Sequence, residues 1–312
     1  MKKQLNISSL FLIPYSLFLL VSLVSCSVPA NKVFGRYVPE RKDDFAWENE
    51  YAAYRCYGPA LANESPSNGV DLWFKASPEL VIDSFYHRDL DLHLPYHLNY
   101  GKGMDGYKVG HTAGCGGLVV KANDQLWVGG PYSRYEILNQ TPEQLQFRLS
   151  YDSLLVAGIV MQEQITITCQ AGQRLNRADV VITAPEGAEV PELFVGGGIY
   201  LHDTIDHPYL CTQCGAIAYA EAALSDKGAI ALNNEFNGGA DQGRAYIAVV
   251  TPEATVVDIQ EGCIVSLKPY TLGETLTYYF GGAWSQWSNG EQSLPTDDDW
   301  WQAIKQIANT KH

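Results

Sequence analysis

Alternation of apolar and polar side chains is the pattern that most limits how this chain can fold. Residues 144–151, QLQFRLSY, place an apolar side chain at every second position, and residues 163–169, EQITITC, repeat the pattern. A period of two puts successive side chains on opposite faces of a β-strand. Both segments are therefore predicted to be strands that bury one face.

Further short runs rich in β-branched and aromatic residues lie on either side, separated by Gly, Pro, Asn and Asp: VDLWFK, GGLVVKA, DQLWVGG, ADVVITA, AYIAVV, ATVVDI, CIVSL and ETLTYYF. Turn residues between such runs are typical of antiparallel sheets. We expect residues 26–312 to form one all-β domain, with a dozen or more strands in two large stacked sheets. A propeller is the alternative, although the internal repeat that it would need is missing.

One helix is predicted, over about residues 297–309. Thr296 can cap its start, and the three aspartates at 297–299 place negative charge on the first turn. An apolar stripe that includes Trp300 and Ile304 follows at helical spacing. We expect this helix to dock on the edge of the sandwich.

Residues 1–25 have the features of a secretion signal. Lys2 and Lys3 precede an apolar run over residues 10–24, and residues 23–26, LVSC, have the large, apolar, small, Cys order of bacterial lipoprotein signals. We expect cleavage before Cys26 and acylation of Cys26, which would tether the chain to a membrane without crossing it. An ordinary signal peptide and a membrane anchor helix are the alternatives, although the run is short for a span. The residues that follow, SVPANK, lack an acidic cluster, which favours the periplasmic face of the outer membrane in the cell envelope.

The charge of the chain excludes one class of partner. Its formal net charge is −14, and removal of Lys2 and Lys3 with the signal makes it more acidic. Nucleic-acid binding needs a basic surface, and the chain has no cluster of three or more Lys or Arg residues. No nucleic-acid partner is expected.

Six cysteines follow Cys26, and two of them form a CxxC motif, CTQC, at Cys211 and Cys214. An exported chain can oxidise such a pair. No second CxxC follows, as most zinc sites need, and no thioredoxin-like βαβ pattern surrounds the motif. We predict a structural disulfide or buried thiols, with a metal site and redox chemistry as alternatives.

Two polar segments carry the candidate site. In the first, residues 43–59, DDFAWENEYAAYRCYGP, alternation puts Trp47 and Glu48 on opposite sides of a strand. An indole can pack on a sugar ring while carboxylate, amide and guanidinium groups bind hydroxyls, and an Arg can hold a uronate carboxylate. The candidate substrate-binding residues here are Trp47, Asn49, Arg55 and Tyr57. An edge strand with a core Trp47 and an ion-paired Arg55 is the structural alternative.

The second segment, residues 94–117, contains seven glycines and shows neither helical nor strand periodicity. Glycines let the backbone turn tightly or approach a ligand closely, and loops on rigid scaffolds often carry binding groups. We expect a loop that brings polar side chains to the edge of a cleft, although a purely structural loop is the alternative. Its candidate site residues are His97, Asp105, Tyr107, Lys108 and His111.

These two segments resemble a known family. Residues 36–61, RYVPERKDDFAWENEYAAYRCYGPAL, and residues 96–118, YHLNYGKGMDGYKVGHTAGCGGL, are similar to blocks of the domain of unknown function 4861 family. The closing segments TYYFGGAWSQW and DDDWWQAIKQIA fit its pattern too, so the likeness spans nearly all of the mature chain. Two departures are His111, where the family pattern has a proline, and TPEQLQFRLSY, which replaces a glycine-proline-arginine start.

The resemblance implies a secreted protein of glycan-foraging Gram-negative bacteria, encoded beside enzymes that degrade pectin-like, uronate-bearing polysaccharides. It also implies the β-supersandwich of galactose mutarotases. An oligosaccharide or polysaccharide is accordingly the expected substrate, and a lipid anchor at Cys26 the expected membrane contact.

Three reactions fit the candidate residues. In β-elimination, a neutral His or a Tyr phenolate removes the proton next to a uronate carboxylate, and a Tyr or Lys protonates the leaving oxygen. In hydrolysis, two carboxylates drawn from Glu48, Glu50 and Asp105 flank the glycosidic bond. A mutarotase-type epimerase could use Glu48 and His97. We expect His97, Tyr107, Glu48 and Asp105 to be the catalytic residues. A non-catalytic glycan-binding lipoprotein is the alternative.

Two further segments contain possible metal ligands. Residues 200–214 contain the pairs His202-Asp203 and Asp206-His207, which zinc could use, but a turn with hydrogen-bonded histidines is the prediction. Residues 233–243, NNEFNGGADQG, offer oxygen ligands without the EF-hand order, and we predict a β-turn loop. No cofactor is expected, with calcium and zinc left open.

Overall fold

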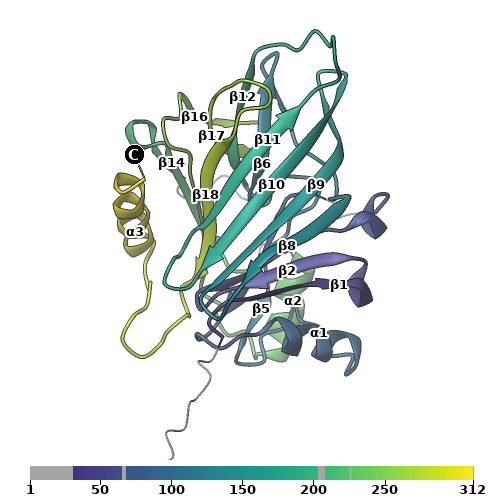
Figure 1. The fold of residues 1–312 in the computed structure, drawn as a ribbon. Coiled ribbons are helices and arrows are strands. Elements are labelled where there is room, and N and C mark those ends of the chain that lie inside the picture. Colours follow the sequence, from purple (N-terminus) through teal and green to yellow (C-terminus); the bar gives the residue numbers. More distant parts are fainter. Residues whose placement is uncertain (1–30, 65–67, 203–207, 225–226, 312) are drawn as a thin grey trace, which may run out of the picture. The chain divides into compact units, whose positions relative to one another are not determined.

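The computed structural model describes residues 31–64, 68–202, 208–224 and 227–311. The predicted signal peptide and Cys26 lie outside these ranges. The described strands pair antiparallel in three sheets (Figure 1). None of the described helices is both long enough and apolar enough to cross a bilayer.

The first sheet carries both candidate segments. Its strands, in spatial order, are β1 (Phe34–Val38), β2 (Asp44–Glu48), β3 (Ala52–Cys56), β4 (Val70–Lys75) and β5 (Gly103–Asp105). The last strand comes from the glycine-rich segment and pairs with β4, so that Asp105 lies opposite Trp73. This pairing brings the two segments to one edge of the molecule.

The second sheet is the largest and contains the long alternating strands. Its order is β13 (Tyr209–Cys211), β14 (Ala216–Ala222), β15 (Arg244–Val250), β18 (Leu276–Trp284), β11 (Asn176–Thr183), β10 (Ile159–Gln170), β9 (Gln144–Val156) and β8 (Arg134–Gln140). The third sheet has the order β16 (Val256–Gln260), β17 (Cys263–Tyr270), β12 (Leu193–Tyr200), β6 (Cys115–Ala122) and β7 (Gln125–Trp127).

The main core lies between these sheets. The predicted alternation is confirmed, because Leu145, Phe147 and Leu149 on β9 are fully buried. They join one apolar cluster with side chains from the other two sheets, including Trp47 and Val120. Burial of apolar surface at this scale is the main source of stability for such a fold.

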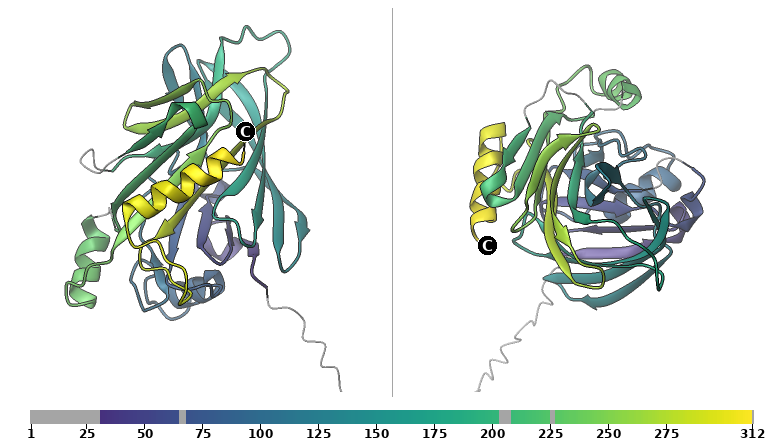
Figure 2. Two further views of the ribbon diagram at one scale, coloured as in Figure 1. Left: turned by 90° about the vertical axis from the view of Figure 1, so that its left-hand side faces the viewer. Right: turned by 90° about the horizontal axis from the view of Figure 1, so that it is seen from above.

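In the described part of the chain, three α-helices flank the sheets: α1 (Ile82–Leu90), α2 (Lys227–Phe236) and α3 (Asp297–Asn309), with short 3-10 turns at Pro39–Arg41, Pro59–Leu61 and Thr212–Cys214. The predicted C-terminal helix is confirmed as α3. Thr296 and Asp299 form a reciprocal capping box at its start. Trp300 donates from Nε1 to the carbonyl oxygen of Ile247, which fixes α3 on the outer face of β14 and β15 (Figure 2).

The all-β class and the antiparallel pairing are confirmed, and the arrangement differs from the prediction in three ways. The helix α1 was not predicted. The strands form three sheets where two were predicted. Residues 233–243 were predicted to be a turn loop, but their first four residues complete α2. The helical pattern of α2 is weak, because a glycine and two asparagines, all poor helix formers, lie within it.

Candidate functional site

A cavity of about 400 Å³ lies where the two candidate segments meet. The first segment contributes Arg55 and Tyr57, and the second contributes His97 and residues 105–110. Gly228, Ala229 and Leu232 of α2 form another wall. The volume falls within the range of small-molecule sites. The structure therefore brings two of the five candidate residues of the first segment together with four of the five in the second.

Arg55 forms the floor of the cavity and is almost entirely buried. Its Nη2 donates to Asp71 Oδ2 at 2.5 Å and to Asp105 Oδ2 at 3.1 Å, and its Nη1 donates to the Tyr96 hydroxyl at 3.0 Å. Asp44 lies 3.6 Å from Nη1. The guanidinium is thus committed to holding β2, β4 and β5 together. It is not placed to clamp a substrate carboxylate with two parallel hydrogen bonds.

Three buried carboxyl groups surround this one guanidinium, and two of them have perturbed acidities. Burial raises the pKa of Asp44 to about 6, with Arg55 and Arg41 opposing the shift. Burial also raises the pKa of Asp105, and the nearby negative charge of Asp71 adds to this, while His97 and Arg55 oppose it. Removing a carboxylate from water disfavours its charged form. The cluster consequently holds less negative charge near neutral pH than three aspartates would suggest.

His97 contacts Asp105 through one ring nitrogen. Nδ1 lies 3.0 Å from the carbonyl oxygen of Asp105 and 3.5 Å from its carboxylate. Both partners are acceptors, so Nδ1 carries the proton and Nε2 is the basic nitrogen of the neutral ring. The His97 side chain is 47% exposed, and Nε2 has no partner within the described ranges. This is the arrangement that a general base needs.

Two tyrosines line the same cavity and differ in their partners. The Tyr107 hydroxyl donates to the carbonyl oxygen of Tyr200 at 3.2 Å, so it is engaged in packing the loop. The Tyr57 hydroxyl has no hydrogen-bond partner among the residues described. Burial raises the pKa of both phenols well above the ordinary value. Neither is a phenolate base, and Tyr57 is a neutral phenol among the residues that line the cavity.

The two remaining candidate residues of the second segment differ in their position relative to the cavity. Lys108 is exposed and lines the cavity. His111 is exposed but is not among the residues that line it.

Three candidate residues of the first segment do not line the cavity, so their predicted contact with substrate is corrected: Trp47, Glu48 and Asn49. Trp47 is fully buried in the main core and donates from Nε1 to Asn176 Oδ1 at 3.1 Å. Asn49 donates to backbone carbonyls of Gln170 and Gln173. The physical reason is register: β2 pairs Trp47 with Tyr54, and Ala46 with Arg55. Trp47 and Arg55 therefore point to opposite faces of the sheet.

Glu48 is also fully buried and has a structural task. Its carboxylate accepts hydrogen bonds from the backbone nitrogens of Val81 and Ile82 at 2.9 Å, at the start of α1. Lys75 completes the arrangement as an ion pair at 2.7 Å. A carboxylate at a helix start satisfies unpaired N–H groups and favours the helix dipole. Glu48 anchors α1 and does not reach the cavity.

Asn233 supports the site without lining the cavity, a role that the sequence did not indicate. It is fully buried on α2, donates from Nδ2 to the carbonyl oxygen of His97 at 2.8 Å, and accepts from the backbone nitrogen of Asn99 at 3.1 Å. Two bonds to one short backbone segment fix the position of α2 against His97. The signal in the sequence is only an asparagine pair, which is also common in turns.

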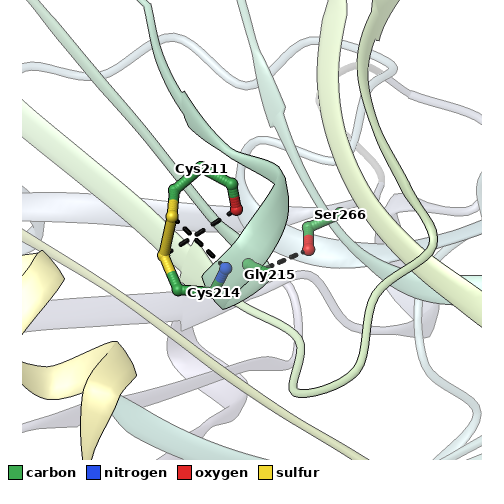
Figure 3. Close-up of a disulfide and its surroundings, with 4 residues drawn as sticks. All are labelled: Cys211, Cys214, Gly215 and Ser266. Atoms are coloured by element: carbon green, nitrogen blue, oxygen red, sulfur yellow. Dashed lines mark hydrogen bonds between the residues drawn. A yellow bond between two sulfur atoms is a disulfide. The ribbon is translucent and has the colours of Figure 1, made fainter.

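The other polar candidates serve structural roles in the described parts of the chain. His202 bridges Glu221, at 2.9 Å, and the carbonyl oxygen of Lys108, as the prediction of a hydrogen-bonded turn requires; Asp203, Asp206 and His207 lie outside the described residues. Cys211 and Cys214 form a disulfide at the turn before β14 (Figure 3). No cluster of three or more metal-ligating side chains occurs among the residues that the structure describes.

Comparison with known proteins identifies the family of the chain. Residues 23–311 match the family described as Domain of unknown function (DUF4861). The chain belongs to this family. The description of the DUF4861 family states no activity.

One curated relative of this DUF4861 chain is the uncharacterized protein P7 of Formosa agariphila, which is 25% identical over 291 residues, covering 88% of this chain and 67% of the relative.

Two solved structures show a remote likeness. One is described as a kojibiose phosphorylase from the human microbiome, with a TM-score of 0.38 and 9% identity over 89% of this chain. The other is the GH36 α-galactosidase AgaB of Geobacillus stearothermophilus, with a TM-score of 0.37 and 10% identity over 84% of this chain. The DUF4861 chain spans 37% and 41% of their respective lengths.

Proposed function

We propose that the cavity between β3, β5 and α2 binds a uronate-bearing sugar fragment and that His97 acts as the general base of a β-elimination. The observation that carries the proposal is the contact of His97 Nδ1 with the backbone carbonyl oxygen of Asp105, from which we assign the tautomer of the ring. Because Nδ1 donates to Asp105, Nε2 is the lone-pair nitrogen in a cavity of sugar-binding size. A neutral imidazole is suited to removing the proton next to a carboxylate near neutral pH.

The elimination assigns one task to each cavity residue. Nε2 of His97 removes the proton from the carbon beside the uronate carboxylate, and the electron pair forms a carbon–carbon double bond as the bond to the glycosidic oxygen breaks. The phenol of Tyr57 donates a proton to that oxygen. Lys108 supplies positive charge to the carboxylate as negative charge builds up on it. Arg55 acts indirectly, because its donors hold Asp71 and Asp105.

Hydrolysis is less well supported by the geometry. It uses two carboxylates on either side of the glycosidic bond. Asp105 is the one carboxylate among the described residues that line the cavity. Glu48 is committed to Lys75 and α1, and Glu50 accepts a hydrogen bond from the backbone of Gly172.

The test is incubation of the mature protein with pectic and glucuronate-containing oligosaccharides. Absorbance of unsaturated uronates and the number of reducing ends are measured together, and calorimetry measures binding. New unsaturated ends support elimination. Reducing ends without unsaturation would support hydrolysis instead, and binding with neither product would support the glycan-binding alternative. Absence of both binding and products would overturn the assignment of the cavity to uronate sugars.

The lipid anchor at Cys26 and the outer-membrane address are part of the same proposal, supported by the LVSC sequence at residues 23–26. Mass spectrometry of the protein from its membrane fraction tests it. Acylation of Cys26 is expected, and an unmodified protein recovered from the periplasm would contradict it.

A further inference from the structure

A second, smaller cavity lies between the three sheets and has a volume of about 30 Å³. Glu163 of β10, Tyr151 of β9, Tyr278 of β18 and Cys56 of β3 line it together with apolar side chains and glycines. It shares no lining residue with the cavity of the proposed function. A volume of this size holds about one or two water-sized species.

Glu163 occupies a position where the strand pattern calls for an apolar residue. Its neighbours two places away on β10, Met161 and Ile165, both point into the core. Glu163 is 4% exposed, and its carboxyl group has no hydrogen-bond or ion-pair partner in the described part of the chain. A buried carboxyl group without a partner is costly, so its presence in a core position needs an explanation.

A second polar group in the cavity is also unsatisfied. The hydroxyl of Tyr278 is fully buried and has no hydrogen-bond partner among the residues that the structure describes. Tyr151 adds another phenol beside Cys56. Gly129 borders the carboxylate, and a methyl group there would lie 3.7 Å from Glu163 Oε2. One carboxylate and two phenols thus line the cavity.

The charge and the number of oxygens limit what can bind. Calcium takes six to eight oxygen ligands, commonly including several carboxylates, and magnesium keeps an octahedral set. This cavity has one carboxyl group, and the described residues lining it include no basic side chain. A charge of −1 is balanced by one monovalent ion.

We propose that this cavity is a binding site for one small monovalent cation, held by the Glu163 carboxylate and the hydroxyls of Tyr278 and Tyr151. Burial raises the pKa of Glu163 to about 8, so proton and cation compete for the same carboxylate. Burial raises the pKa of both phenols and of the Cys56 thiol, which therefore stay neutral as the pH rises. Cation binding should accordingly strengthen from pH 6 to pH 9.

Thermal unfolding of the mature protein in different chloride salts tests the proposal. At pH 8.5 and equal ionic strength, sodium, potassium or ammonium should raise the melting temperature by about 2 °C or more over tetramethylammonium, which is too large for the cavity. The rise should saturate with concentration and shrink at pH 6.

Three variants make the test specific. Glu163→Gln keeps the shape of the protonated acid and should abolish the difference between salts. Gly129→Ala retains the carboxylate, narrows the space beside it and should reduce the difference. Glu136→Gln, a substitution of an exposed residue on β8, should leave the difference between salts unchanged. Equal melting temperatures in all four salts, or a difference that persists in Glu163→Gln, would overturn the site.

Discussion

His97 and Asp105 are joined twice, since Nδ1 of the ring lies 3.0 Å from the backbone carbonyl and 3.5 Å from the carboxylate of the same aspartate. Asp105 is in turn fixed to the floor of the cavity by Arg55 at 3.1 Å. The buried ion cluster of the first sheet therefore helps to position the exposed ring above it, and the backbone carbonyl of Asp105 selects the tautomer of that ring.

Asp105→Asn should lower turnover by roughly 10-fold while leaving substrate affinity nearly unchanged. The backbone carbonyl still selects the tautomer, so the loss should be smaller than for a triad in which the carboxylate alone does so. Steady-state kinetics, which separate kcat from KM, provide the measurement. Asp71→Asn is the matched control, because Asp71 binds Arg55 without lining the cavity. An equal loss of kcat in both variants would show that only the stability of the cluster matters.

Arg55→Ala should destabilise the fold by about 3–5 kcal/mol, because it leaves buried carboxylates without their cation. Denaturant unfolding measures this, and Arg55→Lys, which keeps the charge but loses the planar fork, should retain part of the stability. Arg134→Ala, which removes an exposed ion pair with Asp152, should change stability little. If Arg55→Ala were as stable as Arg134→Ala, the ion cluster would not be the support of the site.

Asn233→Ala should loosen α2 from the cavity and weaken substrate affinity by roughly 10-fold. The change removes the bonds from α2 to His97 and Asn99, each worth about 1 kcal/mol. Hydrogen exchange should become faster in residues 227–236 and at Asn99. Asn234→Ala, an exposed neighbour on the same helix, serves as the control. Unaltered exchange in Asn233→Ala would mean that other contacts hold the helix.

Asp44 gives a prediction with a definite sign. Its pKa is raised from 3.8 to about 6 by burial, so the unfolded chain loses this proton at a lower pH than the folded chain. Its contribution to stability is present below pH 4 and is lost as the pH rises to 6, at up to about 1.4 kcal/mol per pH unit. Asp44→Asn should flatten this part of the stability curve. Denaturant unfolding at pH 4.5 and 6.5 measures how the free energy of unfolding changes with pH in the parent protein and in Asp44→Asn. An equal change in both proteins would refute the assignment.

Much of the fold could be predicted because strand alternation is a local property. Leu145 and Phe147 are inward as predicted, and the capped C-terminal helix begins at Asp297. The site was harder to predict from the sequence. Its geometry depends on which residues lie opposite each other, and that register is set by contacts far apart in the chain. Neither the pairing of Arg55 with Asp71 nor the hydrogen bond from Asn233 to His97 produces a periodic pattern in the sequence.

The errors have the same origin. Trp47, Glu48 and Arg55 look like one sugar-binding group because they are close in sequence. In the structure, Trp47 faces the main core, while Glu48 and Arg55 share the other face but serve α1 and the ion cluster. A buried ion pair and a sugar clamp need the same residue types, so composition alone did not separate them.

The most direct measurement compares turnover of His97→Ala and His111→Ala on the uronate oligosaccharide that the mature protein cleaves best. Loss of a general base costs at least about 100-fold, so His97→Ala should fall by that factor with an unchanged melting temperature. His111→Ala, altered outside the cavity, should stay close to the parent protein. A His97→Ala rate equal to that of the parent would contradict the role of His97 as the base.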